Sequence, residues 1–113
     1  MKIIGLGTDI EECSRFDGKD ELFLNRVFTK NEIEYCKSFK NYSERFAGKF
    51  CAKEACIKAL NDKSISLKNI EILNDENGKP SIFIKENRYQ NYIFMVSVSH
   101  TNNYATAAVI VTI

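Results

Sequence analysis

Residues 43–60 constrain the fold more than any other part of the chain, because their pattern predicts one long helix. The segment contains no proline, and its single glycine is Gly48. Large apolar side chains recur at helical spacing on one face, at Phe46, Phe50, Ile57 and Leu60. A second face carries only small residues, which are Gly48, Ala52, Ala55 and Ala59. This stripe allows a neighbouring backbone to lie close to the helix, although good helix propensity alone also explains it.

Residues 2–10 alternate with period two and predict a β-strand. One face of this strand is apolar, whereas the other carries Gly5, Gly7 and then Asp9. Glycine inside a strand usually marks the close approach of another part of the molecule. We therefore expect a packed element against the glycine face, with Asp9 at its end.

The segment between this strand and the long helix predicts two shorter helices. Residues 14–28 have a helical pattern that is broken at Gly18, with apolar positions at Leu22, Phe23, Val27 and Phe28. Thr29 and Glu32 have the spacing of a capping box, in which each side chain satisfies the other's backbone donor. A short helix is expected to follow, to about Phe39.

After Lys63 the pattern changes to period two and predicts four strands. Two of them flank a hairpin turn at Asn77-Gly78. Residues 92–99 and 104–113 are the other two, and the last is apolar on both faces, which suggests cover from a second subunit. We expect an α+β fold over a single domain, residues 1–113, in which an antiparallel sheet packs on the long helix.

The composition excludes several classes of protein. Sixteen Lys and Arg against fifteen Asp and Glu leave a net charge of +1. This charge is too small for general electrostatic binding of nucleic acid. No apolar run approaches the roughly 20 residues that span a bilayer. Residues 1–5 are too short an apolar stretch for a signal peptide. The four cysteines show no zinc-ligand spacing, so we expect buried free thiols and a cytoplasmic location.

Glu54 is the most informative residue, because it lies at the edge of the apolar stripe rather than on a solvated face. A carboxylate there needs a partner, since desolvating a lone charge is costly. An ion pair with Lys58 at i, i+4 is the simple interpretation. Alternatively, Glu54 and Asp9 supply oxygens to Mg²⁺, which typically takes one or two protein carboxylates. Asp9 has its own simple interpretation as a helix cap.

Cations gather on the same long helix, at Lys49, Lys53 and Lys58, with Arg45 just before them. On a nearly neutral chain they predict a local phosphate site, although a solvated helix face is the usual role of lysines. His100, the only histidine, lies at a strand end, where a structural role and a hydrogen bond to phosphate are both open.

Three segments together carry a resemblance to a known family. Gly7-Thr8-Asp9-Ile10, followed by Arg15, resembles the G-x-D-[IV]-x-x-x-x-R motif of the holo-[acyl-carrier-protein] synthases. Residues 46–55 (Phe-Ala-Gly-Lys-Phe-Cys-Ala-Lys-Glu-Ala) resemble the second motif of that family, F-x-[AG]-[KR]-[FW]-x-x-K-E-A. Residues 77–80 and 97–101 are similar to its C-terminal half. The resemblance spans nearly the whole chain in the family's order.

The resemblance implies transfer of 4′-phosphopantetheine from coenzyme A (CoA) to a serine of apo-acyl carrier protein, with release of adenosine 3′,5′-bisphosphate. It implies Mg²⁺ held by Asp9 and Glu54, with Lys58 as a third catalytic residue. It also implies a homotrimer with CoA in clefts between subunits, without nucleic acid or a membrane. The positions that match family residues near CoA are Lys49, Phe50, Lys53, Lys58, Pro80, His100 and Thr101.

Docking of the acidic carrier protein is implied for Arg15 and, later in the same segment, Arg26. That segment also carries acidic residues, at Asp17, Asp20 and Glu21. The alternative function is a non-catalytic trimeric protein that binds CoA or another pyrophosphate. The proton of the acceptor serine is removed either by Glu54 through a water or by a water at the metal.

Overall fold

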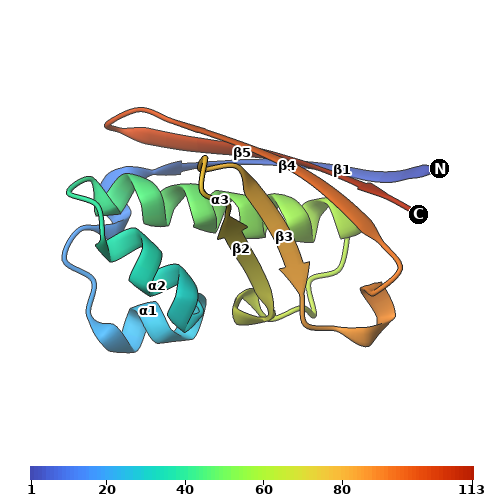
Figure 1. Cartoon of the computed structure of the whole chain (residues 1–113), viewed down its shortest axis with the longest axis horizontal. Coiled ribbons are helices and arrows are strands. Elements are labelled where there is room, and N and C mark those ends of the chain that lie inside the picture. The colour runs from blue at the N-terminus through green and yellow to red at the C-terminus, as the bar shows by residue number, and fades with distance from the viewer.

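A computed structural model describes residues 1–113, and Figure 1 shows how its elements are arranged. The strands are β1 (Ile3–Glu12), β2 (Ile70–Asn74), β3 (Pro80–Ile84), β4 (Ile93–His100) and β5 (Tyr104–Thr112). The α-helices are α1 (Glu21–Val27), α2 (Lys30–Lys37) and α3 (Tyr42–Leu60). Short 3₁₀ turns are η1 (Cys13–Phe16), η2 (Leu67–Asn69) and η3 (Asn87–Tyr89).

The elements form three layers with α3 in the middle (Figure 1). An antiparallel sheet of order β1-β5-β4 covers one side of α3. The second sheet, the β2–β3 hairpin, lies across α3 with β3 next to β4, whereas α1 and α2 lie on the side of α3 away from the larger sheet (Figure 1). The predicted α+β fold, an antiparallel sheet packed on a long helix, is confirmed. No helix of the structure is both long and apolar enough to cross a membrane.

The glycine face of β1 lies directly on the small-residue stripe of α3. A Cβ built on Gly5 would lie 1.8 Å from the carbonyl oxygen of Ala59, and one on Gly7 would lie 1.9 Å from that of Ala55. Two strand residues advance about 6.6 Å, and four helix residues advance about 6.0 Å. The two elements therefore stay in register, and the predicted close approach is confirmed.

The segment between β1 and α3 breaks where the sequence predicts. Gly18 has φ of +62°, a left-handed conformation that glycine adopts without strain. Asp20 then caps α1 by accepting a hydrogen bond from the backbone N–H of Phe23. One apolar position was predicted wrongly: Leu22 is 63% exposed, and Leu24 is buried in its place.

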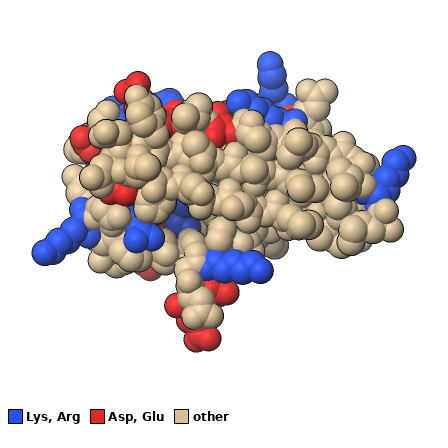
Figure 2. Space-filling view, turned by 90° about the horizontal axis from the view of Figure 1, so that it is seen from above, with Lys and Arg blue, Asp and Glu red and all other residues tan.

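The outward face of the β1-β5-β4 sheet is uncovered within one chain. Side chains of adjacent strands form an apolar row across it, made of Leu6, Ile110 and Met95. Leu6 is 66% exposed and Met95 is 55% exposed. Seen from above, much of this side of the molecule carries few charged side chains (Figure 2). The expected burial of β5 on both faces is therefore met within the chain only on the face that packs against α3.

All four cysteines are buried and free, as the sequence predicts. Burial raises the pKa of the thiols of Cys36, Cys51 and Cys56 to about 12. These side chains therefore stay protonated at neutral pH and contribute to packing rather than to thiolate chemistry.

The contact between β1 and α3 predicts that Gly7→Ala strongly destabilises the protein. The new methyl group has only backbone atoms to displace, and such overpacking costs at least about 2 kcal/mol. Gly48→Ala is the matched control, because its Cβ would meet only the side-chain Cγ1 of Val98, at 3.0 Å. Urea unfolding at one fixed protein concentration measures both. Equal stability of the two variants would contradict the close packing.

Candidate active site

Asp9, Glu54 and Lys58 come together where β1 runs along α3. Asp9 follows the two glycines on the inner face of β1. The strand therefore places it against the helix turn that carries Glu54. Lys58 donates hydrogen bonds to the backbone oxygen of Thr8 (3.0 Å) and to Oδ1 of Asp9 (3.2 Å). The simple pairing of Glu54 with Lys58 is not formed, because Lys58 makes its ion pair with Asp9 instead.

The two carboxylates lie close enough to repel each other, and one of their oxygens lacks a hydrogen-bond partner. Oδ2 of Asp9 is buried and has no hydrogen-bond partner. Burial raises the pKa of Glu54, and the negative charge of Asp9 raises it further. The nearby cations Lys58 and Arg15 oppose this rise. A shared cation would satisfy the unpartnered oxygen and offset the repulsion between the two acids.

Mg²⁺ fits this donor set. It typically binds one or two protein carboxylates and completes its octahedron with water and phosphate oxygens. No group of three or more His, Cys, Asp and Glu side chains is arranged to hold a metal ion. A cation at this site would therefore take several of its ligands from water or substrate.

A second candidate site is a cavity of about 100 Å³ between α3, the β2–β3 hairpin and the end of β4. Its polar lining includes one carboxylate, Glu44, beside Arg45, Lys49, Asn74 and His100, and Gly78 and Pro80 form part of its wall. The Nδ1–H of His100 donates to Oε1 of Glu44 at 2.9 Å. Thr101, by contrast, lies beyond this cavity in the β4–β5 turn, where its Oγ1 accepts from the backbone N–H of Tyr104.

Within one chain the acid pair and this cavity are not joined. Asp9 and Lys58 line a different depression, together with Ser97, Ser99 and Thr106. The sequence motifs treat all these residues as one site. The structure separates them into a carboxylate part and a cation-rich part.

Two residues that were assigned to CoA lie inside the protein. Lys53 is fully buried and forms an ion pair with Glu32 at 2.7 Å. Its ammonium also donates to the backbone oxygens of Leu67 (2.9 Å) and Ile70 (2.6 Å). Phe50 is 6% exposed and packs against Phe16. Within one chain both side chains support the fold, and their predicted contact with CoA stays a prediction.

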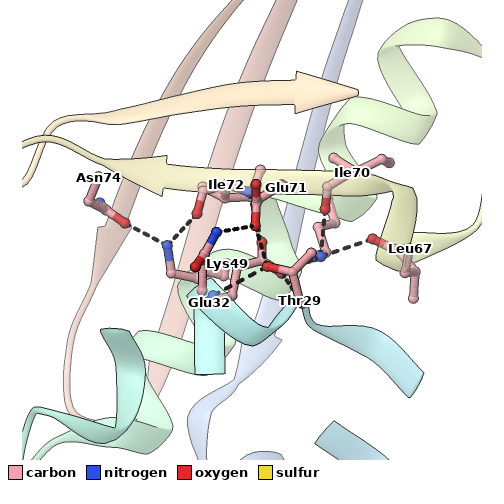
Figure 3. Close-up of polar contacts among 10 residues, drawn as sticks. Thr29, Glu32, Lys49, Leu67, Ile70, Glu71, Ile72 and Asn74 are labelled. Carbon is pink, nitrogen blue, oxygen red and sulfur yellow. Dashed lines mark hydrogen bonds and ion pairs between the residues drawn. The ribbon is translucent and has the colours of Figure 1, made fainter. Parts of the chain in front are cut away.

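Glu32 was predicted only as a helix cap, but it also anchors the hairpin (Figure 3). Its Oε1 accepts from the backbone N–H of Thr29, which completes the predicted capping box. Its Oε2 accepts from the backbone N–H of Ile72 at 2.7 Å. Lys49 donates to the carbonyl oxygen of the same residue at 2.6 Å. Side chains of α2 and α3 thereby provide hydrogen-bond partners for backbone groups at the unpaired edge of β2.

The two arginines predicted to dock a carrier protein lie in different environments. Arg15 donates to Glu11 at 2.7 Å, and its guanidinium lies 4.7 Å from the centre of the Phe50 ring. Arg26 lies in the last turn of α1 and is exposed. Only Arg15 is near the acid pair, since its charge lowers the pKa of Glu54.

Comparisons with known proteins agree with this geometry. The sequence profile of the 4′-phosphopantetheinyl transferase superfamily matches residues 5–109. A holo-[acyl-carrier-protein] synthase of Protochlamydia amoebophila is 43% identical over 92% of this chain and 93% of its own length.

Two solved structures are also similar. The holo-(acyl-carrier-protein) synthase of Bacillus anthracis, in complex with CoA (3′,5′-ADP), has a TM-score of 0.84 and 35% identity, covering 96% of each chain. The Helicobacter pylori synthase in complex with coenzyme A has a TM-score of 0.82 and 31% identity, covering 95% of this chain and 99% of that one.

The fold and the matched motifs define a transferase of the 4′-phosphopantetheinyl class. Within that superfamily, the chain belongs to the family of the holo-[acyl-carrier-protein] synthases.

The burial of Lys53 predicts that Lys53→Met lowers the free energy of unfolding by about 3–5 kcal/mol, because it leaves Glu32 as an unpaired buried charge. The double variant Glu32→Gln, Lys53→Met removes that charge and should recover part of the loss. Urea unfolding followed by circular dichroism measures both. Wild-type stability of Lys53→Met together with lost CoA binding would favour the ligand assignment instead.

Proposed function

We propose that the protein transfers the 4′-phosphopantetheine group of CoA to a serine of apo-acyl carrier protein, with residues 1–113 acting as one domain. The observation that most supports this proposal is that Asp9 and Glu54 lie together beside Lys58. Oδ2 of Asp9 is buried there and has no hydrogen-bond partner. The CoA complexes of the similar synthases support CoA as the donor. Because the four thiols are buried and free, we propose the cytoplasm as the compartment.

In the reaction, the serine oxygen forms a bond to the phosphorus that carries pantetheine. The bond from that phosphorus to the adenosine 3′,5′-bisphosphate group breaks, and the serine loses its proton. Asp9 and Glu54 would hold Mg²⁺, which when bound neutralises negative charge on the phosphates. Lys58 provides a second positive charge beside Asp9, and its side chain is 56% exposed, which leaves it free to approach a phosphate.

The serine proton would pass either to Glu54 through a water or to a water at the metal. Burial and the charge of Asp9 raise the pKa of Glu54 in the metal-free protein, and a bound Mg²⁺ would lower that pKa again. Arg15 lies next to this centre, and we propose that it contacts the acidic carrier protein there. Arg26, on α1, is proposed as a second docking contact.

The cation-rich cavity would hold phosphates of CoA. Lys49, Arg45 and His100 bring donors to it, and Pro80 forms part of its wall. At about 100 Å³ the cavity is smaller than the roughly 300–1,000 Å³ of sites that enclose a whole ligand. We therefore propose that CoA lies between subunits, with the acid pair of one subunit beside the cavity of a neighbour.

The apolar outer face of the sheet is the surface that we propose for assembly into a homotrimer. Exposed apolar patches of this kind mark interfaces between proteins. Leu6, Ile110 and Met95 form its central row.

The activity is tested by mixing the protein with apo-carrier protein, CoA and Mg²⁺ and measuring the mass of the carrier. We expect a gain equal to one phosphopantetheine, and none after removal of divalent cations. A known synthase acting on the same carrier is the positive control. Binding of adenosine 3′,5′-bisphosphate without any mass gain would favour the non-catalytic binding protein instead.

Glu54→Gln should lower turnover by roughly 100-fold or more, since the amide neither binds the cation well nor accepts a proton. The fold should persist, because Glu54 makes no hydrogen bond that supports α3. Glu34→Gln, on the exposed face of α2, is the control and should keep full activity. A normal rate for Glu54→Gln would remove Glu54 from the mechanism.

Met95→Glu should dissociate the assembly, because it places a charge in the centre of the apolar row. Sedimentation velocity is expected to show a trimer for the wild type and a smaller species for the variant. Leu22→Glu, a change at an equally exposed leucine of α1, should leave the trimer intact. A monomeric wild type at working concentration would contradict the proposed assembly.

A further inference from the structure

Lys49 is a buried cation that has no carboxylate partner. Its side chain leaves α3 toward β2, and the residue is only 5% exposed (Figure 3). The ammonium donates to the backbone oxygen of Ile72 at 2.6 Å and to Oδ1 of Asn74 at 2.5 Å. It also lies 4.6 Å from the centre of the Tyr35 ring. All of these partners are neutral.

Lys53, one helical turn further along α3, provides an internal comparison. Both lysines are buried, and both donate to backbone oxygens of the β2 region. Lys53 is neutralised by the carboxylate of Glu32 at 2.7 Å and does not line the cavity. Lys49 makes no ion pair and does line the cavity. The same helix face thus carries one lysine whose charge is compensated and one whose charge remains available.

Asn74 is the side-chain partner that distinguishes Lys49 from Lys53. It is the only side chain that hydrogen-bonds the ammonium of Lys49, and its amide supplies an acceptor without a negative charge. Burial lowers the pKa of Lys49, so a charged ammonium there needs acceptors to hold it. A neutral acceptor stabilises its position while leaving its field directed at the cavity.

The same amide ties the lysine to the hairpin turn. Nδ2 of Asn74 donates to the backbone oxygen of Gly78 at 3.0 Å, and Gly78 lines the cavity. The turn itself is ordered by Asp75, whose carboxylate accepts from the backbone N–H groups of Asn77 and Lys79, each at 2.9 Å. One side chain therefore fixes both a cation of the cavity and a part of its wall.

We propose that Asn74 is a positioning residue for the CoA phosphates. It holds the ammonium of Lys49 at the cavity through a neutral hydrogen bond, so that the charge of Lys49 is left for an anionic group of the ligand. This inference rests on the proposed function, and it assigns to Asn74 a role that none of the sequence motifs contains.

Substitution of Asn74 by Asp tests the role of its neutrality. Asn74→Asp keeps the acceptor for Lys49 and nearly the same shape, but pairs Lys49 with a carboxylate. It also loses the amide donor to Gly78, which Asn74→Ala loses as well, so the comparison of the two variants isolates the added charge. Calorimetric binding of adenosine 3′,5′-bisphosphate should weaken about tenfold or more, as expected when a charged contact is lost. Asn74→Ala leaves the charge of Lys49 free and should weaken binding less, by about threefold. Asn77→Asp, the same change on the same turn without a side-chain hydrogen bond to lose, should bind within twofold of wild type.

Steady-state kinetics and melting temperature separate this role from a purely structural one. For Asn74→Asp the KM for CoA should rise about tenfold, with kcat at saturating CoA within twofold of wild type. Its melting temperature should be no lower than that of Asn74→Ala, because both variants lose the bond to Gly78 and only the carboxylate still accepts from Lys49. A purely structural Asn74 gives the opposite order of binding, with Asn74→Ala the weaker variant. That order, or wild-type affinity of Asn74→Asp, would overturn the proposal.

Failure of the proposed function would look different. The wild type itself would then leave the carrier unmodified, whether or not it binds adenosine 3′,5′-bisphosphate. If the wild type binds the bisphosphate and modifies the carrier, and Asn74→Asp matches it, only the role of Asn74 is rejected.

Discussion

The contact of the β1 backbone with the small side chains of α3 determines where the chemistry of this protein lies. Because Gly5 and Gly7 have no Cβ, the strand rests on the carbonyl groups of Ala59 and Ala55. Two strand residues and four helix residues advance by nearly equal lengths, so the same register carries on to Asp9. The acid is thereby brought to the helix turn between Cys51 and Glu54, and Lys58 reaches it from the next turn. Any residue larger than glycine would push the strand away and separate the two carboxylates.

Opposite β1, the helix uses buried lysines to hold the β2–β3 hairpin. Lys49 and Lys53 donate hydrogen bonds to carbonyl oxygens of β2 that no other strand pairs with, and Glu32 accepts one from a backbone N–H of the same strand. This attachment also sets the wall of the cation-rich cavity. Whether a buried lysine serves the fold or a ligand depends on its partner: a carboxylate neutralises Lys53, whereas neutral oxygens leave the charge of Lys49 exposed to the cavity.

Local patterns predicted most of the fold. The glycine face of β1, the capping box of Thr29 and the hairpin turn at Asn77-Gly78 each depend on residues close in sequence, and each is present in the structure. The burial of Lys53 against Glu32 could not be predicted in this way. Its ion-pair partner is remote in sequence, and α3 is buried around much of its circumference, so helical periodicity does not distinguish a cation that faces a ligand from one that faces Glu32. Asn74 was missed for the same reason, since only the folded hairpin brings it to Lys49.

The central claim is that Asp9 and Glu54 share one divalent cation. A crystal structure of the protein with CoA and Mn²⁺, a spectroscopic substitute for Mg²⁺, tests it most directly through the anomalous signal of the metal. We expect one Mn²⁺ coordinated by a carboxylate oxygen from each of these two residues and by phosphate oxygens of CoA. A metal bound without either carboxylate, or two acids that point to different partners in the presence of CoA, would contradict the claim.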